Sequence, residues 1–192
     1  MSLTADQLTG YVDRSLDADL ARWFPDAPRV DIPAPTRPIA PFLSRLPHEA
    51  ATALAVFDRK VRSGGLAQFL DIYDWSYAFD FAANDCQILD SDYETELSGD
   101  EVWSLGCDGS SNYYVMLTSG KVALWFHEEQ VVEGHTRYDS LDVFLWSAVR
   151  YQAVRAGTLD LAAVEADFRS LGQPGVLAPE IGLLARLSGH RA

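Results

Sequence analysis

The segment VWSLGCDGSSNYYVMLTSGKVALWF, residues 102–126, decides the fold. It contains three runs, 102–105, 113–117 and 122–126, in which β-branched and aromatic residues are frequent. A turn-like Gly-Cys-Asp-Gly-Ser-Ser sequence separates the first two runs, and a short Thr-Ser-Gly-Lys connection separates the last two. A helix would place three glycines at costly interior positions. The segment therefore predicts three consecutive antiparallel strands.

Helical periodicity follows this predicted sheet. After a polar loop, Asp139 or Ser140 can cap a helix whose apolar residues recur at spacings of three and four up to Gly157. We expect the apolar face of this helix to pack on the sheet. Two shorter helices are predicted near the C-terminal end, at 159–171 and at 179–187, the latter with a proline in its first turn.

The N-terminal residues predict one helix followed by an extended arm. Residues 4–24 place apolar side chains near one helical face, and Thr4 with Gln7 has the spacing of a capping box. Prolines then recur from Pro25 to Pro47. Because proline lacks a backbone N–H and has a fixed φ, we expect an extended strap with neither helix nor central strand.

The part between the strap and the predicted sheet gives a weaker pattern. Residues 47–61 predict a second helix, which the following Gly-Gly pair would end. Residues 66–73 are predicted as a short helix. The aromatic stretch 75–81 fits a helix or a strand equally well.

Composition limits the class of protein. A chain of 192 residues with 48% hydrophobic and 22% charged residues has the size and composition of one globular domain with one core. Fifteen Lys and Arg against 28 Asp and Glu give a net charge of −13, which would repel nucleic acid. The N-terminal residues lack a signal-peptide pattern, and no apolar run is long enough to span a bilayer, so we expect a cytoplasmic protein that binds no membrane.

Two cysteines, Cys86 and Cys107, are too few for a disulfide framework and too far apart for a Cys-x-x-Cys motif. We expect both to be buried free thiols. A reactive thiol is the alternative, although neither cysteine has a basic neighbour in sequence that would lower its pKa.

The central motifs resemble those of the SUKH superfamily, the Smi/Knr-like group. The resemblance rests on the Gly-x-Asp-Gly turn at 106–109, the hairpin after it, the Trp-Phe-His-Glu end of the second hairpin strand at 125–128 and the helix start Tyr-Asp-Ser-Leu-Asp-Val-Phe-Leu at 138–145. It covers residues 102–154 well and 47–71 loosely. The Leu-Pro-x-x-Tyr opening lacks its tyrosine, and Ser-Gly-Gly replaces Asn-Gly-Gly.

This resemblance implies an α+β fold with a central, mostly antiparallel sheet and helices packed against it. It divides the chain into an N-terminal helix and strap (1–46), a SUKH-like core (47–157) and a C-terminal helical extension (158–192). It also implies protein binding without catalysis. Many bacterial members are thought to be immunity proteins that neutralise toxins, often nucleases or deaminases, whereas fungal relatives act as regulatory scaffolds.

The motif residues are expected to serve the structure and not to bind an anion, because the Gly-rich phosphate-binding sequences are absent. These residues are Gly106, Asp108, Gly109, Trp125, His127 and Glu128.

No sequence motif indicates a catalytic residue, a cofactor or a metal. His48-Glu49 and His127-Glu128 each begin like His-Glu-x-x-His, and each lacks the second histidine. His127, His135 and the glutamates between them could hold a divalent cation if the loop folded back, but we expect a solvated loop. No Gly-x-Ser-x-Gly elbow occurs, and acidic residues are too numerous for any one pair to stand out as catalytic.

Charge is distributed unevenly along the chain. Between Ser63 and Gly120 there is no Lys or Arg but there are eleven Asp and Glu, without nearby compensation in sequence. A solvated acidic surface is one explanation. A docking face for a basic partner is the other, and its candidate residues are Asp90, Asp92, Glu94 and Glu96.

Aromatic residues interleave with these acids and could anchor a partner. They are Trp75, Tyr77, Phe79 and Tyr93, of which we expect about two thirds to lie in the core.

Three functions remain open at this stage. The first is a non-enzymatic immunity protein that binds a toxin, the second is a regulatory or scaffolding module with an endogenous partner, and the third is an unrecognised hydrolase or metal-dependent enzyme. The oligomeric state is not indicated.

Overall fold

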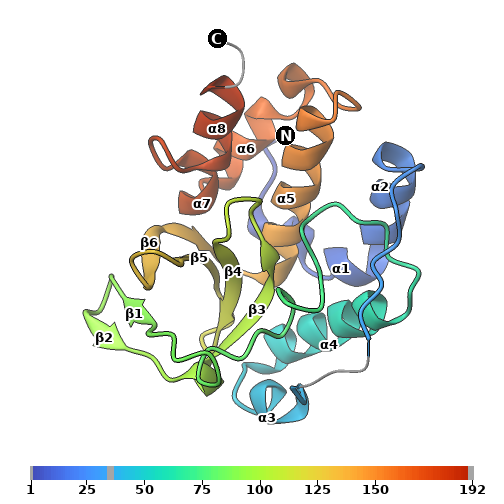
Figure 1. Cartoon of the computed structure of the whole chain (residues 1–192). Coiled ribbons are helices and arrows are strands. Elements are labelled where there is room, and N and C mark those ends of the chain that lie inside the picture. The colour runs from blue at the N-terminus through green and yellow to red at the C-terminus, as the bar shows by residue number, and fades with distance from the viewer. Residues whose placement is uncertain (1, 34–36, 190–192) are drawn as a thin grey trace.

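The computed structural model describes residues 2–33 and 37–189, and helices pack on a six-stranded sheet in it (Figure 1). The α-helices are α1 (Tyr11–Arg14), α2 (Leu16–Trp23), α3 (Ala40–Leu43), α4 (His48–Arg62), α5 (Leu141–Arg155), α6 (Glu165–Leu171), α7 (Pro174–Leu177) and α8 (Leu183–Gly189). The 3-10 turns are η1 (Ala5–Leu8), η2 (Gly99–Glu101) and η3 (Leu161–Ala163), and the strands are β1 (Leu89–Asp90), β2 (Thr95–Glu96), β3 (Val102–Cys107), β4 (Tyr113–Leu117), β5 (Val122–Phe126) and β6 (Val131–Tyr138). The predicted α+β class is confirmed.

The predicted three-strand meander is also confirmed, since β3 pairs with β4 and β4 with β5, both antiparallel. The full strand order is β2-β1-β6-β5-β4-β3. Only the pairing of β1 with β6 is parallel among the strands of the described residues. The sheet is therefore mostly antiparallel, as expected. In the same part of the chain, no helix is long and apolar enough to cross a membrane.

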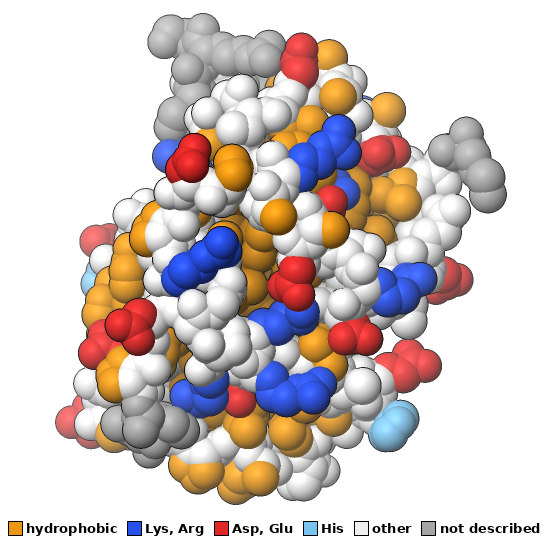
Figure 2. Space-filling model, turned by 90° about the vertical axis from the view of Figure 1, so that its right-hand side faces the viewer, with side chains coloured by type: hydrophobic (Ala, Val, Ile, Leu, Met, Phe, Trp, Pro, Cys, Tyr) orange, Lys and Arg blue, Asp and Glu red, His pale blue; other side chains and the backbone are white. Residues whose placement is uncertain are grey.

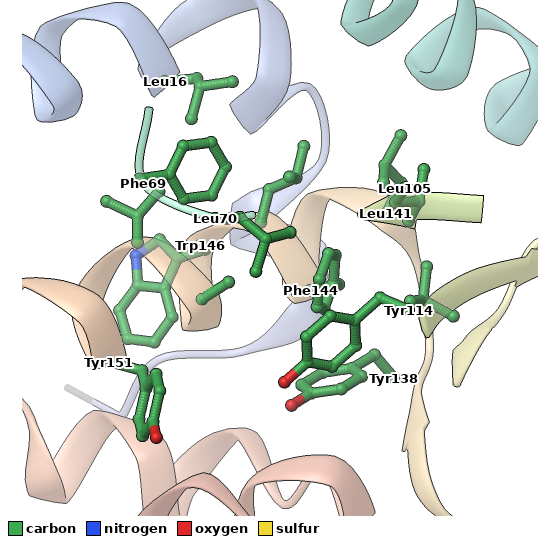
Figure 3. Close-up of a cluster of buried hydrophobic side chains, with 14 of the residues drawn as sticks. Leu16, Phe69, Leu70, Leu105, Tyr114, Tyr138, Leu141, Phe144, Trp146 and Tyr151 are labelled. Atoms are coloured by element: carbon green, nitrogen blue, oxygen red, sulfur yellow. The ribbon is translucent and has the colours of Figure 1, made fainter. Parts of the chain in front are cut away.

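Both faces of the sheet are buried, because side chains alternate between two cores. Tyr114 and Met116 of β4 point to the helices, whereas Val115 and Leu117 point to the opposite face. On the helical face, the rings of Tyr114 and Tyr138 lie 4.7 and 5.2 Å from Phe144 of α5 (Figure 3). The main core collects buried residues from Leu8 to Leu187, so the N-terminal, central and C-terminal segments share it.

The opposite face has a smaller core, to which no helix contributes within the described residues. Phe81 and Ile88 pack there on Trp125 and Val132. Partly buried residues of the acidic segment, which we define as residues 71–101, complete the cover. Irregular chain therefore shields this side of the sheet.

Strand β6 corrects the prediction of a solvated loop after residue 126. Residues 127–130 do form a turn, but Val131–Tyr138 pairs with β5. The register shifts within this pairing, where Thr136 Oγ1 accepts a bond from the Leu124 N–H (2.9 Å) and donates one to the Glu133 carbonyl (2.6 Å). A side chain thus replaces a backbone partner, and this lets a polar sequence stay in the sheet.

The single helix predicted at 4–24 is wrong, because the chain forms η1, α1 and α2 instead. Gly10 breaks it by adopting the left-handed conformation, with φ of 78°. The cause is a tertiary contact with Asp142, whose carboxylate accepts N–H bonds from Gly10 and Val12, each 2.8 Å long. These bonds satisfy the backbone where the helix is interrupted.

Replacing Asp142 with alanine should lower the free energy of unfolding by about 2 kcal/mol, because two N–H groups would lose a charged acceptor. Asp142 is buried, 6% exposed, and the bonds join residues 130 and 132 positions apart. Urea unfolding measures the change. The exposed Asp13→Ala substitution on α1 is the control and should change stability little. Equal effects of the two substitutions would contradict this role.

The strap lies across the body as predicted, with two corrections. Val30 N–H donates to the Leu66 carbonyl (2.8 Å) and Gln68 N–H donates to the Pro28 carbonyl (2.9 Å), so 66–73 is extended chain and not a helix. The strap itself contains α3, whose second residue is Pro41. Proline is tolerated there because first-turn N–H groups have no helical partner. Residues 34–36, with Pro35, lie outside the described part.

The remaining predictions concern helices. α4 and α5 match the expected 47–61 and 141–157, and Ser140 accepts the Val143 N–H as the cap of α5. The expected 159–171 helix is divided into η3 and α6. The helix expected at Pro179 begins at Leu183, because Glu180 adopts φ of 68° and interrupts the chain before it.

Candidate functional site

The Gly-x-Asp-Gly turn closes on its own side chains. Gly106 has φ of 144°, and a Cβ there would come within 2.9 Å of the Asp71 carbonyl, so the close approach of these two chains requires glycine. The buried Asp108 carboxylate accepts bonds from the Ser110 N–H (2.7 Å) and from Asn112 Nδ2 (3.2 Å). Arg186 of α8 lies 3.7 Å from the same carboxylate. The carboxylate oxygens of Asp108 thus already have partners within the protein.

The other motif residues occupy different environments. Trp125 is buried and its Nε1–H donates to the Gln87 carbonyl (3.1 Å). His127 and Glu128 are exposed in the turn after β5, and the His127 backbone N–H donates to Asn112 Oδ1 (3.2 Å). This last bond ties the β5 end to the turn after β3.

The histidines and acids of the described residues nowhere form a group of three or more that could hold a metal ion. His135 lies on β6 and not on a folded-back loop. The absence of a metal in the purified protein stays a prediction.

Neither cysteine lies in an environment that would activate its thiol as a nucleophile, because burial favours the protonated form. Burial, together with the Asp108 and Asp71 carboxylates, raises the pKa of Cys107 to about 12. Burial and Asp85 also raise the pKa of Cys86. Both thiols are therefore protonated at neutral pH, which disfavours cysteine-based catalysis. Cys107 is buried as expected, and Cys86 is half-buried.

The four candidate acids divide into a buried group and an exposed group. Asp90 is only 4% exposed and Arg137 Nη2 lies 2.5 Å from its Oδ1. Arg137 Nε also binds Asp92 Oδ2 at 2.7 Å. No Lys or Arg lies close to Asp90 in the sequence. Its cation, Arg137, comes from β6, 47 residues later. Asp90 is therefore not accessible to a partner, which corrects its assignment to the docking face.

The exposed group lies at the edge of the sheet. We call residues 89–96 the acidic hairpin, because β1 and β2 pair there around a turn at Glu94, whose φ is 51°. Glu94 and Glu96 are exposed, and so are Tyr93 (72%) and Leu89 (42%). β2 is the terminal strand of the sheet in this order. Charged and apolar side chains thus reach solvent together.

The interleaved aromatic residues are core in fewer cases than expected. Tyr77 is buried, Phe79 packs half-buried on the smaller core, and Trp75 (52%) and Tyr93 are exposed. Alternation fails as a guide here because 74–78 is a turn and not a strand.

A second exposed group lies at the start of the acidic segment, and sequence reasoning named one member, Trp75, but missed the other, Tyr73. The rings of Tyr73 and Trp75 stack at 5.4 Å with an interplanar angle of 17°. Tyr73 borders a pocket of about 570 Å³, which Asp71, Asp108 and Arg155 also line. The Tyr-Asp-Trp sequence among acids was the available signal, but nothing local indicated its exposure.

The distribution of exposed apolar residues singles out this segment. Of the five large hydrophobic residues exposed in the described structure, four lie within 71–101: Tyr73, Trp75, Leu89 and Tyr93. Basic side chains gather elsewhere, for example on the side of the molecule where α2 and α4 lie (Figure 2). Exposed aromatic residues surrounded by charged residues are typical of protein-binding surfaces.

Fold and surface define an α+β protein with an acidic, aromatic segment over the face of its sheet opposite the main core. Comparisons with protein families, with curated proteins and with solved structures give no match.

Proposed function

We propose that this chain is a non-enzymatic protein-binding protein of the SUKH type, acting in the cytoplasm as an immunity protein that neutralises a basic toxin domain such as a nuclease or a deaminase. The observation that carries the proposal is the concentration of exposed acids and exposed aromatic residues on one segment, 71–101. The motif resemblance of residues 102–154 supports the toxin-directed role.

The docking face consists of the acidic hairpin without Asp90. Glu94 and Glu96 reach solvent and have no Lys or Arg within salt-bridge distance among the described residues. Arg137 of β6 pairs with Asp90 and Asp92, so the base of the hairpin is tied to the sheet. A charged surface accelerates association with a partner of opposite charge.

The product of the reading frame next to this gene is the partner to test first, because an immunity gene normally lies beside its toxin gene. Expression of that product alone should arrest growth, and co-expression of this chain should restore it. Purified proteins should form a stoichiometric complex in sedimentation. Normal growth without this chain, or no complex between the two proteins, would contradict the proposal for that pair.

A further inference from the structure

We infer that the pocket beside Tyr73 receives an arginine side chain of the protein partner, with the Asp71 carboxylate as its acceptor and the Tyr73 ring, on which Trp75 stacks, as its aromatic wall. This inference rests on the proposed function and adds an anchor to it. The occupant is identified by its chemistry: a planar cation that donates hydrogen bonds to a carboxylate and stacks on aromatic faces.

Asp71 is bonded through its backbone but not through its side chain. The Asp71 backbone carbonyl accepts bonds from the Cys107 N–H and from Ser76 Oγ, both 2.8 Å long. Its side chain, in contrast, accepts no hydrogen bond and forms no ion pair among the described residues. Asp71 is half-buried and lines the pocket. A partly desolvated carboxylate that accepts no hydrogen bond is stabilised by an incoming cation.

The Asp71 carboxylate lies in a negatively charged environment. Burial and then the Asp108 carboxylate raise the pKa of Asp71, while Arg155 opposes them with a smaller effect. Burial, Asp108 and Asp71 also raise the pKa of the Cys107 thiol, which lines the same pocket. Asp108 itself is bonded within its turn and lies near Arg186. The pocket therefore favours a positive charge at Asp71.

Aromatic surface adjoins the pocket. Tyr73, which lines it, is 39% exposed, and Trp75, whose ring stacks on Tyr73 at 5.4 Å, is 52% exposed. A volume of about 570 Å³ accommodates a side chain of arginine size, since ligand pockets commonly measure about 300–1,000 Å³. Arg155, which also lines the pocket, is exposed, and its Cζ lies 5.7 Å from the centroid of the Tyr151 ring.

Acetyl-arginine amide is the probe, and acetyl-citrulline amide, its uncharged counterpart of the same shape, is the control ligand. Trp75 reports binding by fluorescence, because every other tryptophan is at most 8% exposed. Amide NMR shifts at Tyr73 and Gly109 provide a second readout. We expect saturable arginine binding with a Kd on the order of millimolar and no saturation by citrulline.

Three variants decide the chemistry. Asp71→Asn should weaken arginine binding roughly tenfold, whereas Asp74→Asn, which removes an exposed neighbouring charge outside the pocket, should leave it unchanged. Arg155→Ala should leave binding equal or tighter, because it removes a like charge. Loss of binding in Arg155→Ala would identify a site for an anion or a zwitterion and overturn the inference. Equal binding of arginine and citrulline would also overturn it.

The inference and the proposed function fail separately. If arginine does not bind, the pocket is not an anchor, whatever the acidic hairpin does. If arginine binds as expected but no protein partner is slowed by changes in the hairpin, the proposed docking face fails and the pocket remains.

Discussion

Replacing Arg137 with methionine is expected to lower the free energy of unfolding by about 3–5 kcal/mol, because the substitution leaves a buried charge unpaired. Arg137 is 8% exposed and Asp90 is 4% exposed, with 2.5 Å between Nη2 and Oδ1. Methionine fills a similar volume but cannot donate to Asp90 or Asp92. The Asp90 carboxylate would then stay buried without a cation to compensate its charge. Urea unfolding at neutral pH measures the loss.

Lys121→Met provides the matched control for this substitution. Lys121 pairs with Asp139 at 3.6 Å, and both side chains are about half exposed (47% and 56%). Exposed pairs contribute about 0–1 kcal/mol, so the control should stay within that range. If Arg137→Met changed stability no more than Lys121→Met, the stabilising role of the Arg137–Asp90 pair would be contradicted.

Replacing Arg37 with alanine is expected to cost about 3 kcal/mol of stability and to loosen the strap, because one guanidinium serves three carbonyl groups. Arg37 donates to the carbonyls of Gly99 and Val102 at 2.9 Å and to that of Phe79 at 3.3 Å. Its Cζ also lies 4.9 Å from the centroid of the Trp103 ring. Arg37 thus joins the strap to Phe79 and to residues 99–102, where the acidic segment leads into β3.

The measurement for Arg37 combines urea unfolding with limited proteolysis of the strap. Arg37→Lys should recover only part of the loss, since an ammonium group cannot reproduce the planar fork. Arg29→Ala is the control, because exposed Arg29 makes one bond, to the Gly65 carbonyl at 3.2 Å. Similar stability and protease resistance for Arg37→Ala and Arg29→Ala would contradict the anchoring role.

The sequence predicted the elements whose signals are local. β3, β4 and β5 follow from residue alternation and turn sequences, and α5 follows from its Ser140 cap and apolar spacing. In β4 the alternation sorts side chains between two buried faces, so both sets are apolar and the strand is easily recognised.

Non-local contacts explain the failures. The N-terminal helix is interrupted by Asp142, 130 residues away in sequence from Val12. β6 has polar residues throughout its centre, and its strand character arises from pairing with β5. Neither partner can be recognised from the interrupted segment itself.

The candidate site shows the same limit for charge. Counting residues between Ser63 and Gly120 finds no cation, yet Asp90 is neutralised by Arg137 and Asp100 pairs with Arg45. Glu94 and Glu96 remain exposed, as a docking face requires. Sequence alone therefore located the acidic segment but could not sort its buried acids from its exposed ones.

The central claim is that the exposed acids of the hairpin steer a basic partner, and association kinetics test it most directly. The variant is Glu94→Gln with Glu96→Gln, which removes two exposed charges and leaves Asp90 and Asp92 bound to Arg137. The matched control is Asp13→Asn with Glu49→Gln, which removes two exposed charges elsewhere.

Stopped-flow mixing of the partner with wild type, variant and control across salt concentrations gives the association rate constants. We expect the hairpin variant to associate roughly threefold more slowly than wild type at low salt, with the dissociation rate little changed. The control should match wild type. The difference should shrink as the Debye length falls to about 8 Å near physiological ionic strength. Equal association rates for wild type and hairpin variant at low salt would contradict the claim.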